Sequence, residues 1–172
     1  MKTKGREGAD WGYRTIGPGW HLVCVQEGID YLKDDTGTRV VNAKGLNSVM
    51  IPLAVDDGSD SDNGLRVTIF ANNDNFGEQK MADVIEAAGL TADFEKNFPG
   101  DVSFFEDRVF AAVQRHLQGR FLKVNIAHSL VKKDGVEKTY ANVVNVDKAG
   151  AATPAAPKST TATNGQSAAK GW

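Results

Sequence analysis

The stretch LRVTIF (residues 65–70) alternates apolar and more polar positions, and this alternation decides the fold class. Successive side chains of a strand point to opposite faces, so a period of two predicts a strand with one buried face. The first, third and fifth residues of the stretch are expected to face the core. Arg66, Thr68 and Phe70 are therefore expected to face outward.

Two more strands are predicted before this stretch. Residues 49–55 (VMIPLAV) alternate in the same way and predict a second strand with one buried face. Residues 20–25 (WHLVCV) are apolar on both faces, as in a closed barrel or a covered sheet. Residues 31–45 contain two turn signals, and residues 56–64 (DDGSDSDNG) predict a polar, solvated connection between two strands.

Helical spacing follows the alternating stretch. Met81, Val84, Ile85 and Ala88 recur at the spacing of one helix face, and Gly89 stands where a C-terminal capping glycine belongs. A second helix is predicted over residues 105–117. The helical part of the chain thus lies after the third predicted strand.

The last predicted elements form a hairpin. Leu122, Val124 and Ile126 predict a strand, residues 132–135 (KKDG) a turn, and residues 139–146 (TYANVVNV) the returning strand. Three strands, a helical insert and a hairpin predict a mainly β fold, a five-stranded OB-like barrel with helices between strands 3 and 4. An α+β sandwich could share this order.

Composition changes at both ends of the chain. Residues 1–16 predict a flexible N-terminal arm, residues 17–148 the OB-like domain, and residues 149–172 a disordered tail of small residues and proline. No signal peptide or membrane-spanning run is present in the sequence. Cys24 is the single cysteine, which suits a reducing compartment, so a cytoplasmic location is expected.

Enzyme chemistry finds little support in the residue pattern. His21, His116 and His128 lack metal-site spacing, and Cys24 lies inside an apolar strand, as a core residue would. The aspartates of residues 56–62 do not follow the calcium-loop pattern. We therefore expect no catalytic residue, metal or cofactor. A metal-dependent nuclease is a distant alternative.

Charge is distributed unevenly along the chain. The formal net charge is −2. The segment 115–138 nevertheless contains only Asp134 and Glu137 as acids, against six basic residues: Arg115, Arg120, Lys123, Lys132, Lys133 and Lys138. Such a segment can attract phosphates, although lysines in a hairpin also protect sheet edges.

Aromatic residues add a second feature of nucleic-acid binding. The second and third strands of an OB barrel supply its usual ligand face, so an outward Phe70 beside Arg66 suits base stacking. The predicted nucleic-acid-binding residues are Tyr31, Arg66, Phe70, Arg120, Lys123, Lys132, Lys133, Lys138 and Tyr140.

Several motifs resemble those of a known family. They are Gly-Pro-Gly-Trp at 17–20, residues 117–124 (LQGRFLKV), residues 132–135 (KKDG) and residues 140–143 (YANV). Together they resemble phage and prophage proteins catalogued as a domain of unknown function. The resemblance spans roughly residues 16–146 and implies an OB-fold single-stranded-DNA-binding protein encoded near recombination or replication genes and located in the cytoplasm of a bacterial host cell.

The leading hypothesis is sequence-tolerant binding of single-stranded DNA in phage replication or recombination. The alternative is a protein-interaction or assembly module on the same barrel, without nucleic-acid binding, in which the helical insert and Trp172 contact a partner or a second copy. Replication or recombination proteins could also bind through the C-terminal tail. That tail lacks the acidic, aromatic-tipped end of bacterial single-stranded-DNA-binding proteins, because no acid follows Asp147.

Overall fold

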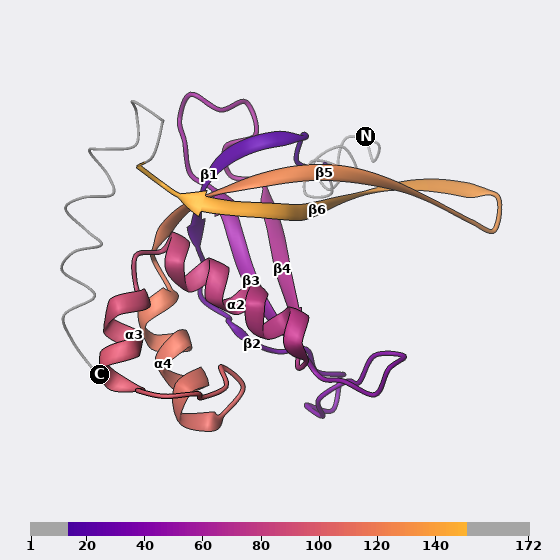
Figure 1. The fold of residues 1–172 in the computed structure, drawn as a ribbon. Coiled ribbons are helices and arrows are strands. Elements are labelled where there is room, and N and C mark those ends of the chain that lie inside the picture. The colour runs from indigo at the N-terminus through magenta and orange to yellow at the C-terminus, as the bar shows by residue number, and fades with distance from the viewer. Residues whose placement is uncertain (1–13, 151–172) are drawn as a thin grey trace.

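The computed structural model describes residues 14–150 (Figure 1). Within that range the chain forms six strands and three helices. In chain order they are β1 (Gly19–Val25), β2 (Asp30–Tyr31), β3 (Ser48–Val55), β4 (Arg66–Asn72), α2 (Asn75–Ala87), α3 (Thr91–Asn97), α4 (Asp107–Leu117), β5 (Phe121–Lys133) and β6 (Val136–Lys148).

One antiparallel sheet holds all six strands. One edge of β3 pairs with β1 and, further along, with β2, while its other edge pairs with β4 over residues 48–54. The free edge of β1 pairs with β5, and β5 pairs with β6. The path through the long strands is therefore β4-β3-β1-β5-β6.

The two ends of this path, β4 and β6, lie next to one another without a hydrogen-bonded ladder. We call the line between them the seam. The strand order and the helices between β4 and β5 are consistent with the predicted OB-like fold. Closure of the barrel by hydrogen bonds is not confirmed, because the seam is not paired.

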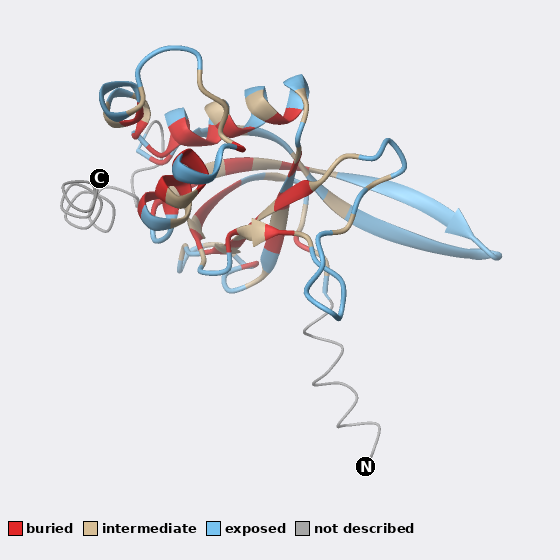
Figure 2. Ribbon diagram, turned by 90° about the horizontal axis from the view of Figure 1, so that it is seen from below, coloured by how far each residue is buried: buried red, intermediate tan, exposed pale blue. Residues whose placement is uncertain are grey.

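The core lies inside the curved sheet and under the helices. The four alternating apolar residues of β3 are all buried, and so are Val67 and Ile69 of β4. Met81, Val84 and Ile85 of α2 face the same cluster. Figure 2 shows buried residues along the inner sides of the strands and helices. The predicted alternation of β3 and β4 is thus confirmed.

Both predicted helices form, and the second starts later than predicted. The first begins at Asn75, where the side chain of Asp74 accepts a hydrogen bond from the Gly77 amide, and Gly89 follows its end with a positive φ of 77°. The second begins at Asp107 rather than at residue 105. Between them, α3 covers the core with Phe94 and was not predicted.

The hairpin of β5 and β6 is longer than predicted. Each strand has 13 residues, and beyond Ile126 strand β5 pairs with β6 alone. We call residues 127–142 the arm. Its turn has positive φ at both Asp134 and Gly135, as a two-residue type I′ hairpin requires. Figures 1 and 2 show the arm projecting away from the sheet, with its surface exposed.

The described ends of the chain pack on the domain. Ile16 is buried, and the Nε2 atom of His128 lies 2.7 Å from its carbonyl oxygen. Residues 14–16 therefore belong to the domain rather than to a flexible arm. Residues 1–13, and residues 151–172 of the tail predicted over residues 149–172, lie outside the described residues. No helix in residues 14–150 is long and apolar enough to cross a membrane.

Candidate nucleic-acid interface

The outer face of β3 and β4 forms an exposed platform. Phe70 lies opposite Met50 in the ladder, and its side chain is 49% exposed. Arg66 lies on the same face of β4, earlier in the strand, and is also exposed. Thr68, between the two, is partly exposed. The prediction that these three side chains face outward is confirmed. An exposed ring beside a guanidinium suits a base and its phosphate.

Phe70 lines a shallow pocket on the seam. Thr68 and Phe70 of β4, Lys80 of α2 and residues 141–143 of β6 surround a volume of about 220 Å³. The Lys80 ammonium donates a hydrogen bond to the carbonyl oxygen of Phe70, at 2.9 Å. A cation therefore lies beside the exposed ring, at the point where the arm begins.

The register of the arm gives its two faces different chemistry. Tyr140 opposes Ser129, Lys138 opposes Val131 and Val136 opposes Lys133, so Tyr140, Lys138 and Lys133 share one face. The other face bears Lys132 opposite Glu137. The first face, which we call the tyrosine face, thus combines an exposed ring with two lysines and no acid.

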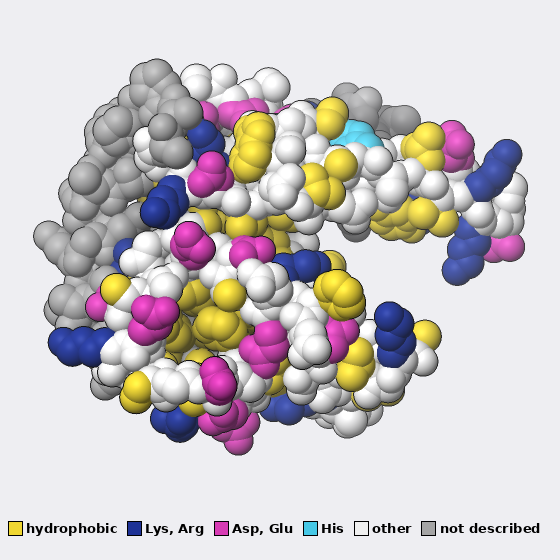
Figure 3. Space-filling model, viewed as in Figure 1, with side chains coloured by type: hydrophobic (Ala, Val, Ile, Leu, Met, Phe, Trp, Pro, Cys, Tyr) yellow, Lys and Arg dark blue, Asp and Glu magenta, His cyan; other side chains and the backbone are white. Residues whose placement is uncertain are grey.

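Positive charge also lies across from the arm. The segment 32–47 between β2 and β3 contributes Lys33, Arg39 and Lys44, and all three are exposed. Figure 3 shows a deep notch under the arm, with Lys or Arg side chains on both sides of it. Lys33 is paired with Asp30 and Arg39 lies over the ring of Tyr31, which leaves Lys44 without an ion pair among the described residues.

Tyr31 was predicted to stack on bases, and this prediction is wrong. Its side chain is only 4% exposed, and its ring lies 4.9 Å from that of Phe110 between ring centroids. Its hydroxyl donates to the carbonyl oxygen of Phe105, and burial raises its pKa. The ring is part of the core because α4 and the preceding turn cover β2.

Arg120 was predicted to contact phosphate, and this prediction is also wrong. The residue is 4% exposed, and its Nε donates to the carbonyl oxygen of His116 at 3.4 Å. Its Nη2 has no hydrogen-bond partner among the described residues, and burial lowers the pKa of the guanidinium. A buried guanidinium cannot meet a strand that lies on the surface.

The predicted lysines divide into two groups. Lys132, Lys133 and Lys138 are exposed near the tip of the arm. Lys123 is half-buried at the base of β5, directly opposite Asp147, and does not line the seam pocket with Phe70. The predicted site residues that are exposed are Arg66 and Phe70 on the outer face of β4, Lys133, Lys138 and Tyr140 on the tyrosine face of the arm, and Lys132 on its other face.

Sequence reasoning missed two residues of the seam. Lys80 and Phe76 both come from α2, and the Phe76 side chain is 85% exposed. Lys80 gives no signal in the sequence, because a single lysine on the polar face of a helix is ordinary. Phe76 gives a weak one, because it is an aromatic residue outside the apolar spacing of the predicted helix.

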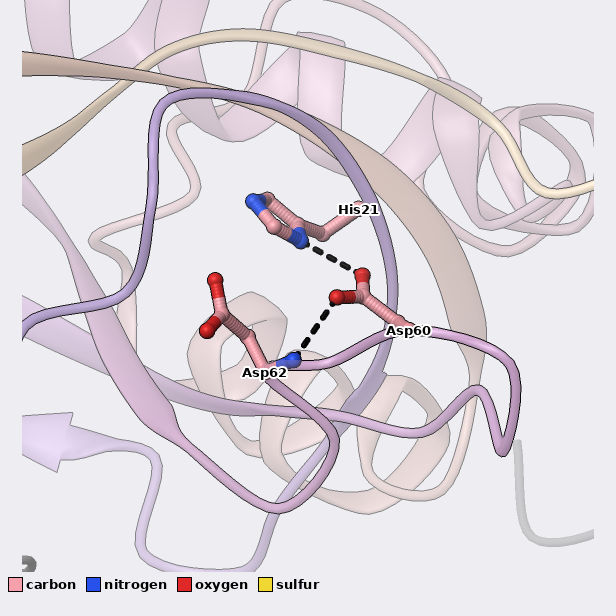
Figure 4. A group of neighbouring side chains, drawn as sticks. All are labelled: His21, Asp60 and Asp62. Atoms are coloured by element: carbon pink, nitrogen blue, oxygen red, sulfur yellow. Dashed lines mark hydrogen bonds and ion pairs between the residues drawn. The ribbon is translucent and has the colours of Figure 1, made fainter.

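The acidic loop connects β3 and β4 and is mostly exposed, as predicted, but hydrogen bonds hold Asp60 and Asp62 against the domain (Figure 4). His21 places Nδ1 2.6 Å from Asp60 and Nε2 2.7 Å from the carbonyl oxygen of Gly17. Asp62 is buried and accepts hydrogen bonds from the Gly17 amide and from Arg14, each at 2.8 Å. The Gly17 amide is the main reason that the pKa of Asp62 is lowered.

His21, Asp60 and Asp62 offer ligand atoms within 4.8 Å of one another, a spacing that a metal ion could use. Each of these atoms already has a partner within the protein, and the Arg14 cation lies against Asp62. The geometry therefore supports a structural role, which ties the β3–β4 loop to the start of β1.

Comparisons with known proteins add little. No protein-family model matches the chain, and no curated protein sequence matches it. The family resemblance suggested by the motifs is thus not confirmed. Among solved structures, the chain is similar to yeast RPA bound to ssDNA, with a TM-score of 0.35 and 9% sequence identity. The likeness covers 81% of this chain and 85% of that chain.

Proposed function

We propose that this protein binds single-stranded DNA with little sequence preference, on the outer face of β4, along the seam and on the tyrosine face of the arm. The observation that carries the proposal is the exposed Phe70 ring with the Lys80 ammonium at its backbone and β6 beside it. Base stacking on an exposed ring contributes about 1–3 kcal/mol per base and tolerates any base.

The arm extends the same surface. Tyr140 is 47% exposed and could stack a second base, while Lys133 and Lys138 on its face could meet phosphates. Lys132, on the opposite face at the tip, adds to the local positive potential. Lysines that neutralise phosphates release counterions, so binding of this kind weakens as salt rises.

A role in phage replication or recombination is part of the proposal and rests on the resemblance of the sequence motifs. Homo-oligomerisation and recruitment of replication proteins through the tail stay predictions, and so does the absence of enzymatic activity.

The test is a fluorescence-anisotropy titration with labelled oligo-dT at several salt concentrations. We expect saturable binding at low salt, and we expect Phe70→Ala to weaken it about fivefold to a hundredfold through the lost stack. Trp20→Ala is the matched control, because Trp20 is also 49% exposed but lies on β1, between β3 and β5 and away from the seam.

Two results would overturn the proposal. One is the absence of binding at low salt, and the other is equal loss of affinity in the Phe70 and Trp20 variants. In either case the alternative of a protein-interaction module gains support. Light scattering with and without the oligonucleotide then distinguishes DNA binding from assembly, because a module that assembles by itself has the mass of an oligomer even without DNA.

A further inference from the structure

A second and larger groove continues from the Phe70 pocket along the seam. It lies between α2 and β6 and has a volume of about 410 Å³. The two spaces share Ile69, Lys80 and Val143 and are therefore adjacent, so a strand lying on Phe70 extends toward the larger groove. We call the larger space the seam groove.

The walls of the seam groove are mainly apolar. Phe76 forms one side with a ring that is 85% exposed, and Val144 of β6 forms the other with a side chain that is 52% exposed. Ligand sites commonly combine such walls with a few polar groups that fix orientation. A flat ring system can pack between an aromatic and an aliphatic wall.

Besides Lys80, three polar side chains line the same groove: Gln79, Asp83 and Asn145. The amide nitrogen of Gln79 donates to one carboxylate oxygen of Asp83, at 2.9 Å. This bond orients the carboxylate, which retains capacity for further donors because each carboxylate offers several lone pairs. The groove thus presents an oriented acceptor beside an exposed ring.

We propose that the seam groove takes one unstacked nucleobase with an exocyclic amine from a strand whose neighbouring base stacks on Phe70. The inference rests on the proposed function and deepens it. The amine of cytosine or adenine donates to Asp83, whereas thymine presents a carbonyl oxygen to the carboxylate at the corresponding position. The protein therefore tolerates most sequences and prefers such a base at one position.

The experiment compares three labelled strands of about 12 nucleotides, a length within the range that one OB fold covers. The host is oligo-dT, and the central nucleotide is dT, dC or dA. We expect the strands with dC or dA to bind about fivefold more tightly, or better, than all-dT. Asp83→Ala should remove this difference between the strands.

Two further variants distinguish the groove from its surroundings. Val144→Trp should fill the groove and remove the preference. Because Val144 is exposed, the variant protein should still fold with the larger side chain. Glu95→Ala, at an exposed acid on α3, is the matched control and should keep the preference. Circular dichroism checks that every variant is folded.

The outcomes separate the two proposals. Equal binding of the three strands, or a preference that survives both Asp83→Ala and Val144→Trp, overturns the base site. Binding of all-dT that still depends on Phe70 then leaves the proposed function standing, whereas no binding to any strand overturns both. If Val144→Trp changes the oligomeric mass of the protein without DNA and leaves the base preference unchanged, the groove is a protein contact and the base site is overturned.

Discussion

Phe70 and Tyr31 are aromatic residues on two strands that pair with β3, yet they have different surroundings. Phe70 lies on the outer face of β4 and is 49% exposed, whereas Tyr31 packs against Phe105 and Phe110 and is 4% exposed. The difference comes from the helices, because α4 and the turn before it cover β2 and leave the outer face of β4 open. Only a ring on the uncovered side can exchange water for a base.

Cys24 should react slowly with thiol reagents in the folded protein. Burial, with a smaller effect from Asp56, raises its pKa to about 11, so at pH 8 only about one thiol in a thousand is thiolate. We expect the rate of modification by a disulfide reagent to rise about tenfold per pH unit between pH 8 and 10. Unfolding in urea should accelerate the reaction at pH 8 on the order of a hundredfold.

Rapid labelling of the folded protein at pH 7 would contradict this expectation. The matched measurement is the same reaction in urea, where the single cysteine acts as its own control.

Sequence periodicity predicted the facing of side chains better than their burial. The outward direction of Arg66, Thr68 and Phe70 follows from alternation within one strand, which is a local property. The burial of Tyr31 depends on α4 and the turn before it, which are distant in sequence, and no local pattern reports on it. Arg120 lies just after α4 and bonds back to the carbonyl oxygen of His116, a contact that strand alternation does not reveal either.

At the scale of elements, α2 decides what the seam can bind, because it supplies Phe76 and Lys80 and runs beside both β4 and β6. Asp74 caps its first turn. Gly77 lets the helix lie directly against the end of β4, since a Cβ at this position would overlap the backbone of Asn72. The helix was predicted from its apolar spacing, but this close approach has no sequence pattern that would reveal it.

Gly77→Ala should therefore destabilise the protein and weaken the site together. The methyl group forces α2 away from β4, and we expect the free energy of unfolding to fall by about 2 kcal/mol or more. Affinity for oligo-dT should fall as well, because Lys80 would no longer reach the carbonyl oxygen of Phe70. Urea unfolding and anisotropy measure the two effects.

The control is Gly58→Ala in the β3–β4 loop, where a Cβ meets open space and φ is not positive. It should change the free energy of unfolding by less than about 0.5 kcal/mol. Equal stability of the two variants would show that α2 can shift without cost.

Across the whole molecule, opposite charges occupy different regions. The three arm lysines lie near its tip, whereas Figure 3 shows acidic side chains gathered over the helices. This separation lets a chain with net charge −2 present cations to a strand.

The turn at residues 132–135 was predicted, but the full length of the arm was not. Both faces of the arm are exposed, so its sequence lacks the alternation that marks a half-buried strand.

Removing the outer arm should therefore reduce DNA binding without unfolding the domain. Beyond Ile126 strand β5 pairs only with β6, so replacing residues 130–139 by Asn-Gly leaves every other strand pair intact. Ser129 and Tyr140 already oppose one another and can flank the new two-residue turn.

The shortened protein loses Lys132, Lys133 and Lys138. Lys133 and Lys138 are the proposed phosphate contacts, so the slope of log K against log salt should fall by about 1.4, at about 0.7 for each lost phosphate contact on a single strand. Lys96→Ala, at an exposed lysine on α3, should leave the slope unchanged. A folded, shortened protein with the slope of the parent would show that the arm lysines do not contact the strand, and would confine the interface to β4 and the seam.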